Sequence, residues 1–207
     1  QISQIEKVQM KEIEKIAQMG EIKTKYPNRE ECKKIMEDYG TPERVIKHTE
    51  TVALIAQKIA ERLIDKGIKL NIPLIVSSAY LHDIARTESK HDIKGAEYLK
   101  KIGLYEVAEV IRDHTFHKIT DNISEIDETD VLCLADRMTV EDRFVGPEMR
   151  MEYINNKAVL KFGEEKRDEL EEKAKSFIRY VHELEIFMGK KIEELIPSSI
   201  KPVSYTH

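Results

Sequence analysis

Apolar residues recur at intervals of three and four along nearly all of this 207-residue chain. This spacing places them on one face of an α-helix, whereas the apolar residues of a half-buried β-strand alternate with a period of two. The chain contains no internal repeat, no low-complexity tract and no long linker rich in Gly, Pro or Ser. We therefore predict an all-α protein that folds as one domain over residues 1–207, a usual size for a single core.

The predicted helices fall into three groups along the chain. An amphipathic helix is expected over about residues 1–20, a helical core over about 39–145, and a charged helical extension over about 147–196. Within the core, Thr41 is expected to be the N-cap of a helix whose first residue is Pro42. We expect the extension to be one helix without chemistry of its own. Its apolar stripe consists of Phe177, Val181, Leu184 and Met188.

The charge of the chain restricts its possible partners. The formal charge is −5 and the isoelectric point is near 5.9, so there is no electrostatic reason to expect binding to a nucleic-acid polymer or an anionic membrane. No apolar run reaches the roughly 18 to 20 residues of a membrane span, and the polar N-terminus lacks a secretory signal. The two cysteines, Cys32 and Cys133, have no metal-ligand spacing. We expect a cytoplasmic protein.

Histidine and aspartate residues interrupt the apolar faces of four predicted helices. His48 lies in the helix expected over about Pro42–Asp65, and His82-Asp83 in the helix expected over about Pro73–Ala85. His114 lies at the end of the helix expected over about Tyr105–His114, and Asp136 in the helix expected over about Glu128–Arg143. One such residue is more often a hydrogen-bonded core residue than a ligand, but each is costly to bury unpaired. A shared divalent cation would satisfy all of them, because imidazole and carboxylate are ligands of first-row metals. The pattern therefore favours metal binding.

The same residues resemble the motif of the HD-domain superfamily of metal-dependent phosphohydrolases. That motif is a His, an adjacent His-Asp pair and a distant Asp, here His48, His82-Asp83 and Asp136. The surrounding segments KHTETVALIAQKIA, SSAYLHDIAR and VLCLADRM are similar to the helices of the family. The resemblance implies an HD-domain helical bundle with extra N-terminal and C-terminal helices, and it implies that these four residues bind one metal ion.

A subgroup of the family has two further histidines. The segments HDIKGAEYL and IRDHTFH supply similar residues, His91 and His114. The resemblance then implies a second ion held by these histidines, with Asp83 bridging the two ions. A ligand set of imidazole and carboxylate without thiolate suits one or two divalent ions of Mn, Fe, Co or Zn, and the choice among these metals stays open.

Two subgroups compete as the nearest likeness. The DHT and ADR segments around His114 and Asp136 resemble hydrolases of dinucleoside tetraphosphates. The segments NIPLIVSSAYLHDIAR, KGAEYLKKIG and LADRMTVEDRFVGPEMR also resemble HD domains that accompany nucleotidyltransferases in molybdenum-enzyme maturation. The resemblance therefore leaves the substrate open.

Four basic side chains near the metal motifs are candidate substrate ligands, namely Arg86, Arg137, Arg143 and His117. Guanidinium groups hold phosphate oxygens through charge-assisted hydrogen bonds. For Arg137, Arg143 and His117, a position on the solvated surface is an open alternative. Arg86 closely follows the His-Asp pair, so we assign it to catalysis together with Asp83.

We predict a phosphohydrolase that cleaves a nucleotide or another phosphate ester or anhydride through a metal-activated water. The expected partner is a phosphorylated small molecule, with no nucleic-acid polymer and no membrane, and the terminal helices could join two copies into a homodimer. Two other classes stay open. A di-iron oxygenase of HD fold would use the same ligands, and a nucleotide-binding accessory module with little catalysis would also account for the terminal helices.

Overall fold

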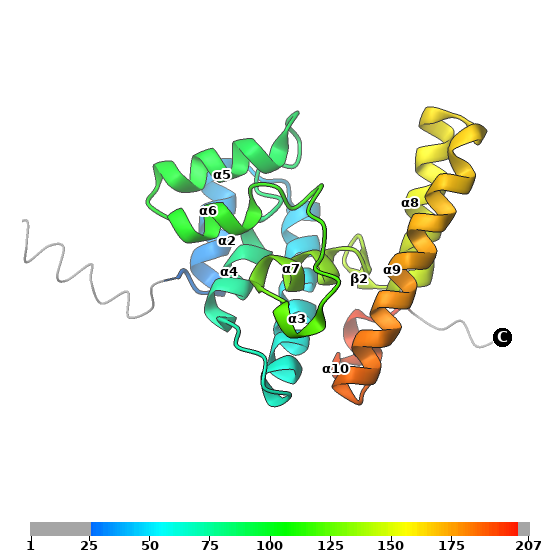
Figure 1. Cartoon of the computed structure of the whole chain (residues 1–207). Coiled ribbons are helices and arrows are strands. Elements are labelled where there is room, and N and C mark those ends of the chain that lie inside the picture. The colour runs from blue at the N-terminus through cyan, green and yellow to red at the C-terminus, as the bar shows by residue number, and fades with distance from the viewer. Residues whose placement is uncertain (1–25, 203–207) are drawn as a thin grey trace, which may run out of the picture.

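The computed structural model describes residues 26–202, and the helix expected over residues 1–20 lies outside this range. The all-α prediction is confirmed, because helices dominate and one short hairpin is the only sheet within these residues (Figure 1). The α-helices are α2 (Arg29–Tyr39), α3 (Glu43–Asp65), α4 (Ile72–Leu81), α5 (His91–Lys101), α6 (Tyr105–Ile111), α7 (Glu128–Asp136), α8 (Gly146–Phe162), α9 (Arg167–Met188) and α10 (Ile192–Leu195). Single 3-10 turns are η1 (Ile123–Glu125), η2 (Glu164–Lys166) and η3 (Ser198–Ile200).

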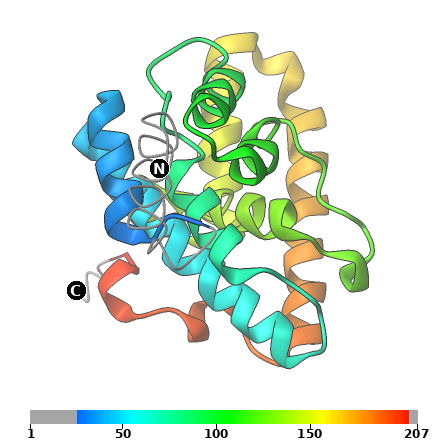
Figure 2. The same ribbon diagram turned by 90° about the vertical axis from the view of Figure 1, so that its left-hand side faces the viewer.

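The long helix α3 forms the centre of the core. It packs against α4 and α7, and its apolar face is fully buried, with Val52, Ile55, Ile59 and Leu63 each at 0% exposure. Helices α5 and α6 pack on one another, and α6 also packs on α4. Seen from the side in Figure 2, the red C-terminal segment that contains α10 returns to the cyan helix α3, which it contacts. No helix of residues 26–202 is both long enough and apolar enough to cross a lipid bilayer.

Local sequence signals set several helix ends. Asn28 and Asp127 each form a capping box at the start of α2 and α7, and α2 ends at Gly40 with a φ of 91°. The prediction for the start of α3 was wrong, because Pro42 is the N-cap and Glu43 is the first helical residue. The hydroxyl of Thr41 instead donates to the carbonyl of Ile84 at 2.7 Å. This bond ties the start of α3 to the turn that carries the His-Asp pair.

Three predicted helices end earlier than expected. Helix α4 ends at Leu81 and α6 at Ile111, so the histidines that follow them lie in turns. Helix α7 ends at Asp136, and the chain then forms the antiparallel hairpin of β1 (Thr139–Val140) and β2 (Arg143–Phe144). The hydroxyl of Thr139 donates to the carbonyl of Ala135 at 2.8 Å, and Glu141 takes a φ of 52° in the turn between the strands. Continued helix would have kept the Glu141 carbonyl away from the core.

The C-terminal extension is two antiparallel helices and not one. Helices α8 and α9 pack together and are separated by Gly163, whose φ of 102° is a conformation that non-glycine residues rarely adopt. The base of this α8–α9 hairpin belongs to the core, because Val181, Leu184 and Met188 of the predicted stripe are fully buried. Its tip projects away from the core (Figure 1), and Leu160 is 87% exposed.

Because Leu184 is buried and Leu160 is exposed, the same substitution should have different effects at the two ends of the hairpin. We expect Leu184→Ala to lower the free energy of unfolding by about 2–5 kcal/mol and Leu160→Ala to change it by less than about 0.5 kcal/mol. Urea denaturation of the two variants measures both values. Equal effects would show that the base of the hairpin is not part of the core.

Candidate metal centre

The six predicted metal ligands come together from five helices of the core. Each lies within a helix or within three residues of a helix end. His48 lies in the second turn of α3, His82 and Asp83 follow α4, His91 begins α5, His114 follows α6, and Asp136 ends α7. The pair that follows α4 is the most deeply buried, since His82 is 0% and Asp83 is 4% exposed.

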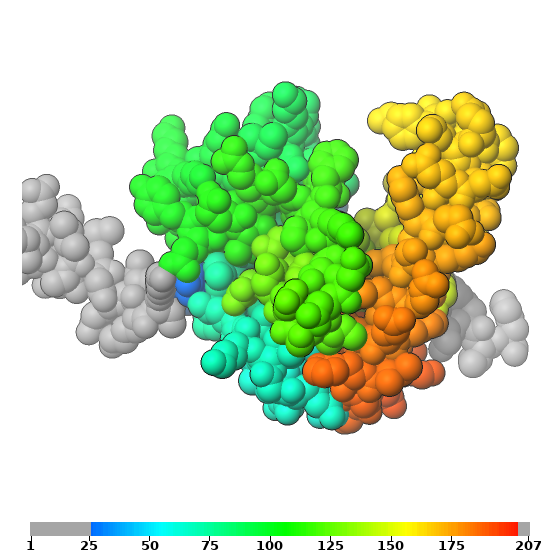
Figure 3. All heavy atoms as spheres, viewed as in Figure 1, coloured from blue at the N-terminus to red at the C-terminus, as the bar shows by residue number. Residues whose placement is uncertain are grey.

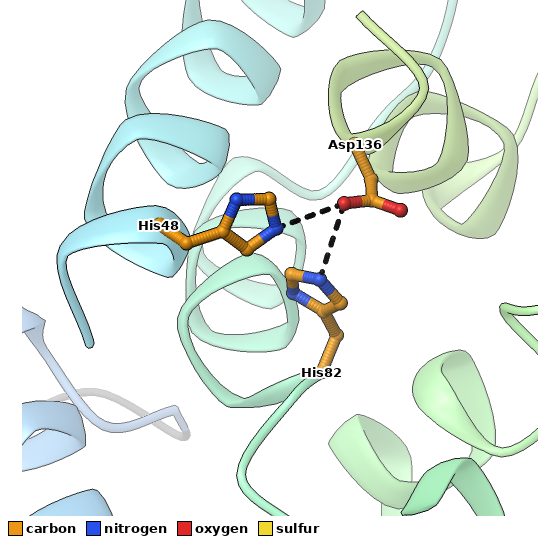
Figure 4. A group of neighbouring side chains, drawn as sticks. All are labelled: His48, His82 and Asp136. Atoms are coloured by element: carbon orange, nitrogen blue, oxygen red, sulfur yellow. Dashed lines mark hydrogen bonds and ion pairs between the residues drawn. The ribbon is translucent and has the colours of Figure 1, made fainter. Parts of the chain in front are cut away.

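One group of ligands gathers around Asp136. Its Oδ1 lies 3.0 Å from the Nε2 of His48 and 3.5 Å from the Nε2 of His82. In Figure 4 both imidazole rings point at this carboxylate from different helices. The Oδ2 of Asp83 completes the group at 3.9 Å from His48 Nε2 and 3.7 Å from His82 Nε2. These are the four residues of the HD motif.

The second group lies on the other oxygen of Asp83. Its Oδ1 is 3.3 Å from the Nε2 of His91 and 3.5 Å from the Nε2 of His114. The two oxygens of one buried carboxylate therefore face two different pairs of histidines. A carboxylate placed in this way could contact two metal ions.

Backbone carbonyls fix the orientation of three of the histidine rings. The Nδ1 of His48 lies 2.6 Å from the carbonyl oxygen of Glu141, that of His82 lies 2.7 Å from Ala79, and that of His114 lies 2.7 Å from Ile111. An Nδ1–H that donates to a carbonyl leaves Nε2 as the nitrogen with the lone pair. In all three residues this Nε2 points into the centre, ready to bind a metal.

The residues present fit a metal ion by two further observations. The Nε2 of His82 and the Oδ1 of Asp83 are buried without a hydrogen-bond partner among residues 26–202, which is costly unless another group satisfies them. Donors bound at about 2.1 Å to one ion lie about 3.0–3.4 Å apart in octahedral or tetrahedral geometry. Two of the distances above, those of 3.0 Å and 3.3 Å, fall in that range, and the other four are slightly longer. The residues of the centre therefore fit a divalent metal ion.

The charges of the centre are strongly coupled. Burial by itself raises the pKa of the Asp83 carboxyl, but the charge of His82 and the imidazoles of His114 and His91 beside the carboxylate outweigh it and hold the pKa well below its usual range. Burial by itself lowers the pKa of His48 and His82, but the nearby carboxylates of Asp136 and Asp83 outweigh it and raise both values. The carboxylates and the imidazoles of the centre therefore each favour the charged form of the other.

Arg86 lies at the edge of the second group. Its Nη1 is 3.1 Å from His91 Nε2 and 3.7 Å from Asp83 Oδ1, and its side chain is 49% exposed. The guanidinium thus stands between the centre and solvent. Arg86 and Arg137 both line the cleft that opens onto the centre, together with His48, Asp83 and Asp136.

Two other predicted substrate ligands do not line this cleft. The Nε2 of His117 lies 2.7 Å from Asp130 Oδ1, on the capping box of α7, and Arg143 donates to the carbonyl of Ser199. His117 therefore contacts a buried carboxylate at the start of α7, and Arg143 contacts the C-terminal segment. His117, Asp127 and Asp130 also lie close enough to share an ion, but the two aspartates already cap α7.

The sequence analysis missed the far wall of the cleft. This wall belongs to the α8–α9 hairpin, which was expected to carry no chemistry, and its basic lining residues are Arg150, Lys157, Lys161 and Lys173. The first three recur at intervals of seven and four, so they share one face of α8. The sequence signal for this basic face was the spacing of the three residues. The same spacing occurs on the solvent-exposed face of many charged helices, so it did not predict a cleft.

Comparison with known proteins identifies the family. Residues 45–143, which include all six ligands, match the HD domain family. The chain therefore contains an HD domain, as its motifs predicted. An HD domain implies divalent-metal binding and activity of the metal-dependent phosphohydrolase type.

A search of curated proteins found a distant relative. The tRNA (cytidine(56)-2'-O)-methyltransferase of Picrophilus torridus is 27% identical over 154 residues, which cover 67% of this chain and 44% of that protein. The chain thus spans less than half the length of this relative. The search of solved structures gave no match.

Removal of a central ligand should abolish metal binding. We expect His82→Ala to weaken metal affinity by more than roughly 100-fold, because the fully buried Nε2 is lost as a ligand. His182→Ala is the matched control, since His182 pairs with Glu148 and its side chain is 55% exposed. Metal at 100 times the wild-type Kd should stabilise the wild type and this control by about 2.7 kcal/mol, and His82→Ala by less than about 0.4 kcal/mol. Metal analysis and thermal unfolding with and without chelator measure both effects.

The raised pKa values of His48 and His82 predict opposite pH trends for the two forms of the protein. In the metal-free protein, protonation of these two histidines adds to the free energy of unfolding. This stabilisation is fully present below about pH 6.5 and is lost as the pH rises through their raised pKa values. Metal binding displaces these protons, so metal affinity should instead fall as pH is lowered. Urea unfolding at about pH 6 and about pH 9, in chelator and in excess metal, tests both signs. A metal-free protein that gains stability between these values would contradict the assignment.

Proposed function

We propose that the protein is a metal-dependent phosphohydrolase that cleaves a phosphate ester or anhydride of a nucleotide. The observation that carries this proposal is the position of Asp83, a buried carboxylate whose two oxygens each face a pair of histidines. The HD domain of the chain supports the reaction class. His48, His82, Asp83 and Asp136 would hold one ion, and Asp83, His91 and His114 the second.

A divalent ion bound here would supply a nucleophilic water at neutral pH and would stabilise negative charge on the phosphoryl oxygens. The side chains of the cleft hold the substrate in position. Arg86, half exposed at the edge of the centre, can donate to phosphate oxygens, and Arg137 adds a second guanidinium on the same cleft. The Nη2 of Arg137 donates to the carbonyl of His117 at 2.6 Å, which restrains its position.

The size and lining of the cleft support a nucleotide as substrate. Its volume of about 1160 Å³ exceeds the roughly 300–1,000 Å³ of most small-molecule pockets. Its lining combines basic residues with Tyr153, Ile154 and Phe177, so the cleft offers surfaces for both phosphate and an apolar base. A simple phosphate ester would leave much of this volume unused.

A second candidate is that the phosphate belongs to RNA. The similarity to a protein named as a tRNA methyltransferase favours it, although the chain spans only 44% of that protein. Under this proposal the cleft would accept the end of an RNA strand, and the charge that attracts the polymer would be local, since the net charge of the chain is −5.

A phosphate-release screen tests the hydrolase proposal. The metal-loaded protein is incubated with nucleoside mono-, di- and triphosphates, dinucleoside polyphosphates and short RNA, in Mn, Fe, Co, Zn or Mg. We expect turnover in the wild type and in His182→Ala, and a loss of more than roughly 1,000-fold in Asp83→Asn, which cannot hold both ions. Turnover that consumes oxygen would favour the di-iron oxygenase instead. Tight nucleotide binding without any turnover would favour an accessory module.

A further inference from the structure

The cleft has two walls of different origin. The wall that carries the metal ligands is built by the core, and the opposite wall by the α8–α9 hairpin. Figure 3 shows the surface hollowed between the core in green and the hairpin in yellow and orange. Because the hairpin is anchored only at its base, its tip stands across open space from the metal centre.

The basic residues on the cleft side of α8 lack acidic partners. Arg150, Lys157 and Lys161 form no ion pair within residues 26–202, and the Nε of Arg150 is buried there without a hydrogen-bond partner. Basic residues of η2 and α9 differ, since Lys166 and the cleft-lining Lys173 pair with Glu169, and Lys175 pairs with Glu172. Within the hairpin, the cations without acidic partners are therefore those of α8 that line the cleft. An anion that enters the cleft would satisfy these cations.

An aromatic ring lies within the same basic face. The guanidinium of Arg150 is 5.6 Å from the centroid of the Tyr153 ring, and the ammonium of Lys157 is 4.4 Å from it. Both cations therefore lie within cation–π distance of one ring. Aromatic and basic residues in one groove are a combination that binds nucleotide chains.

The metal centre and Arg86 account for one phosphate group, the one that reacts. Arg150, Lys157 and Lys161 lie on the other wall, so a single phosphate at the metal ions leaves them without a ligand. A substrate with a second phosphate could use both walls.

We propose that the α8–α9 hairpin is a recognition wall, and that its Arg150, Lys157 and Lys161 bind a second phosphate group of the substrate, separate from the one that is cleaved. The inference deepens the proposed function and rests on it for the place of the reacting phosphate. The ligand is a nucleotide with at least two phosphate groups. These phosphates can belong either to a polyphosphate chain or to a phosphodiester chain. These residues determine specificity and take no part in bond cleavage.

A charge-neutralised triple variant tests the recognition wall. It carries Arg150→Gln, Lys157→Gln and Lys161→Gln, and its control carries Lys166→Gln, Lys175→Gln and Arg179→Gln on the outer side of the same hairpin, outside the cleft lining. Both variants lose three positive charges. Calorimetry in chelator measures binding of inorganic phosphate, tripolyphosphate, a nucleoside triphosphate and a short oligoribonucleotide, so no probe is hydrolysed. Urea unfolding checks that both variants are folded.

We expect the cleft variant to bind at least one multi-phosphate probe roughly tenfold or more weakly than the wild type and the control do. Loss with the triphosphate and tripolyphosphate identifies a polyphosphate chain, and loss with the oligoribonucleotide alone identifies a phosphodiester chain. Unchanged binding of every multi-phosphate probe, or an equal loss in the control, would overturn the inference.

Turnover separates this inference from the hydrolase proposal. With metal present, the cleft variant should keep kcat on a nucleoside monophosphate and lose the preference for substrates with more phosphates through a higher KM. If the wild type hydrolyses nothing, the hydrolase proposal fails, whereas the binding difference in chelator still decides whether the wall recognises phosphate.

Discussion

The buried carboxylate of Asp83 is the constraint on which the rest of the centre depends. Asp83 is 4% exposed, and a carboxylate buried to this degree is stable only when opposite charges or hydrogen-bond donors surround it. Here four imidazole rings supply that environment, two on each oxygen. The four histidines come from α3 or from residues at the ends of α4, α5 and α6. These helices must therefore converge on the Asp83 carboxylate.

Much of the fold and of the ligand set was predictable from the sequence. The apolar periodicity indicated the helices, and polar residues on apolar faces indicated the centre, because such residues are rarely buried without a shared partner. His48, Asp83 and Asp136 were identifiable on this ground together with their order in the chain. The division of the residues into two groups came from the resemblance to the family and not from the apolar periodicity, since it depends on the direction of side chains in turns after α4 and α6.

The ends of helices and the C-terminal hairpin show where sequence reasoning stops. The residues after Asp136 look helical by composition, but the hairpin β1–β2 forms there and places the Glu141 carbonyl on His48 Nδ1. A single Gly163 divides the extension into two helices, which turns a charged surface helix into a cleft wall. The function of Arg150 could not be read from its spacing, because tertiary folding alone decides which face of a charged helix meets solvent.

Crystallography with anomalous scattering at the absorption edge of the added metal tests the central claim most directly. The account predicts two ions on either side of Asp83, one about 2.0–2.2 Å from His48, His82 and Asp136 and the other at the same distance from His91 and His114. Metal peaks that avoid Asp83, or a fully metal-soaked crystal with no peak at this centre, would contradict it.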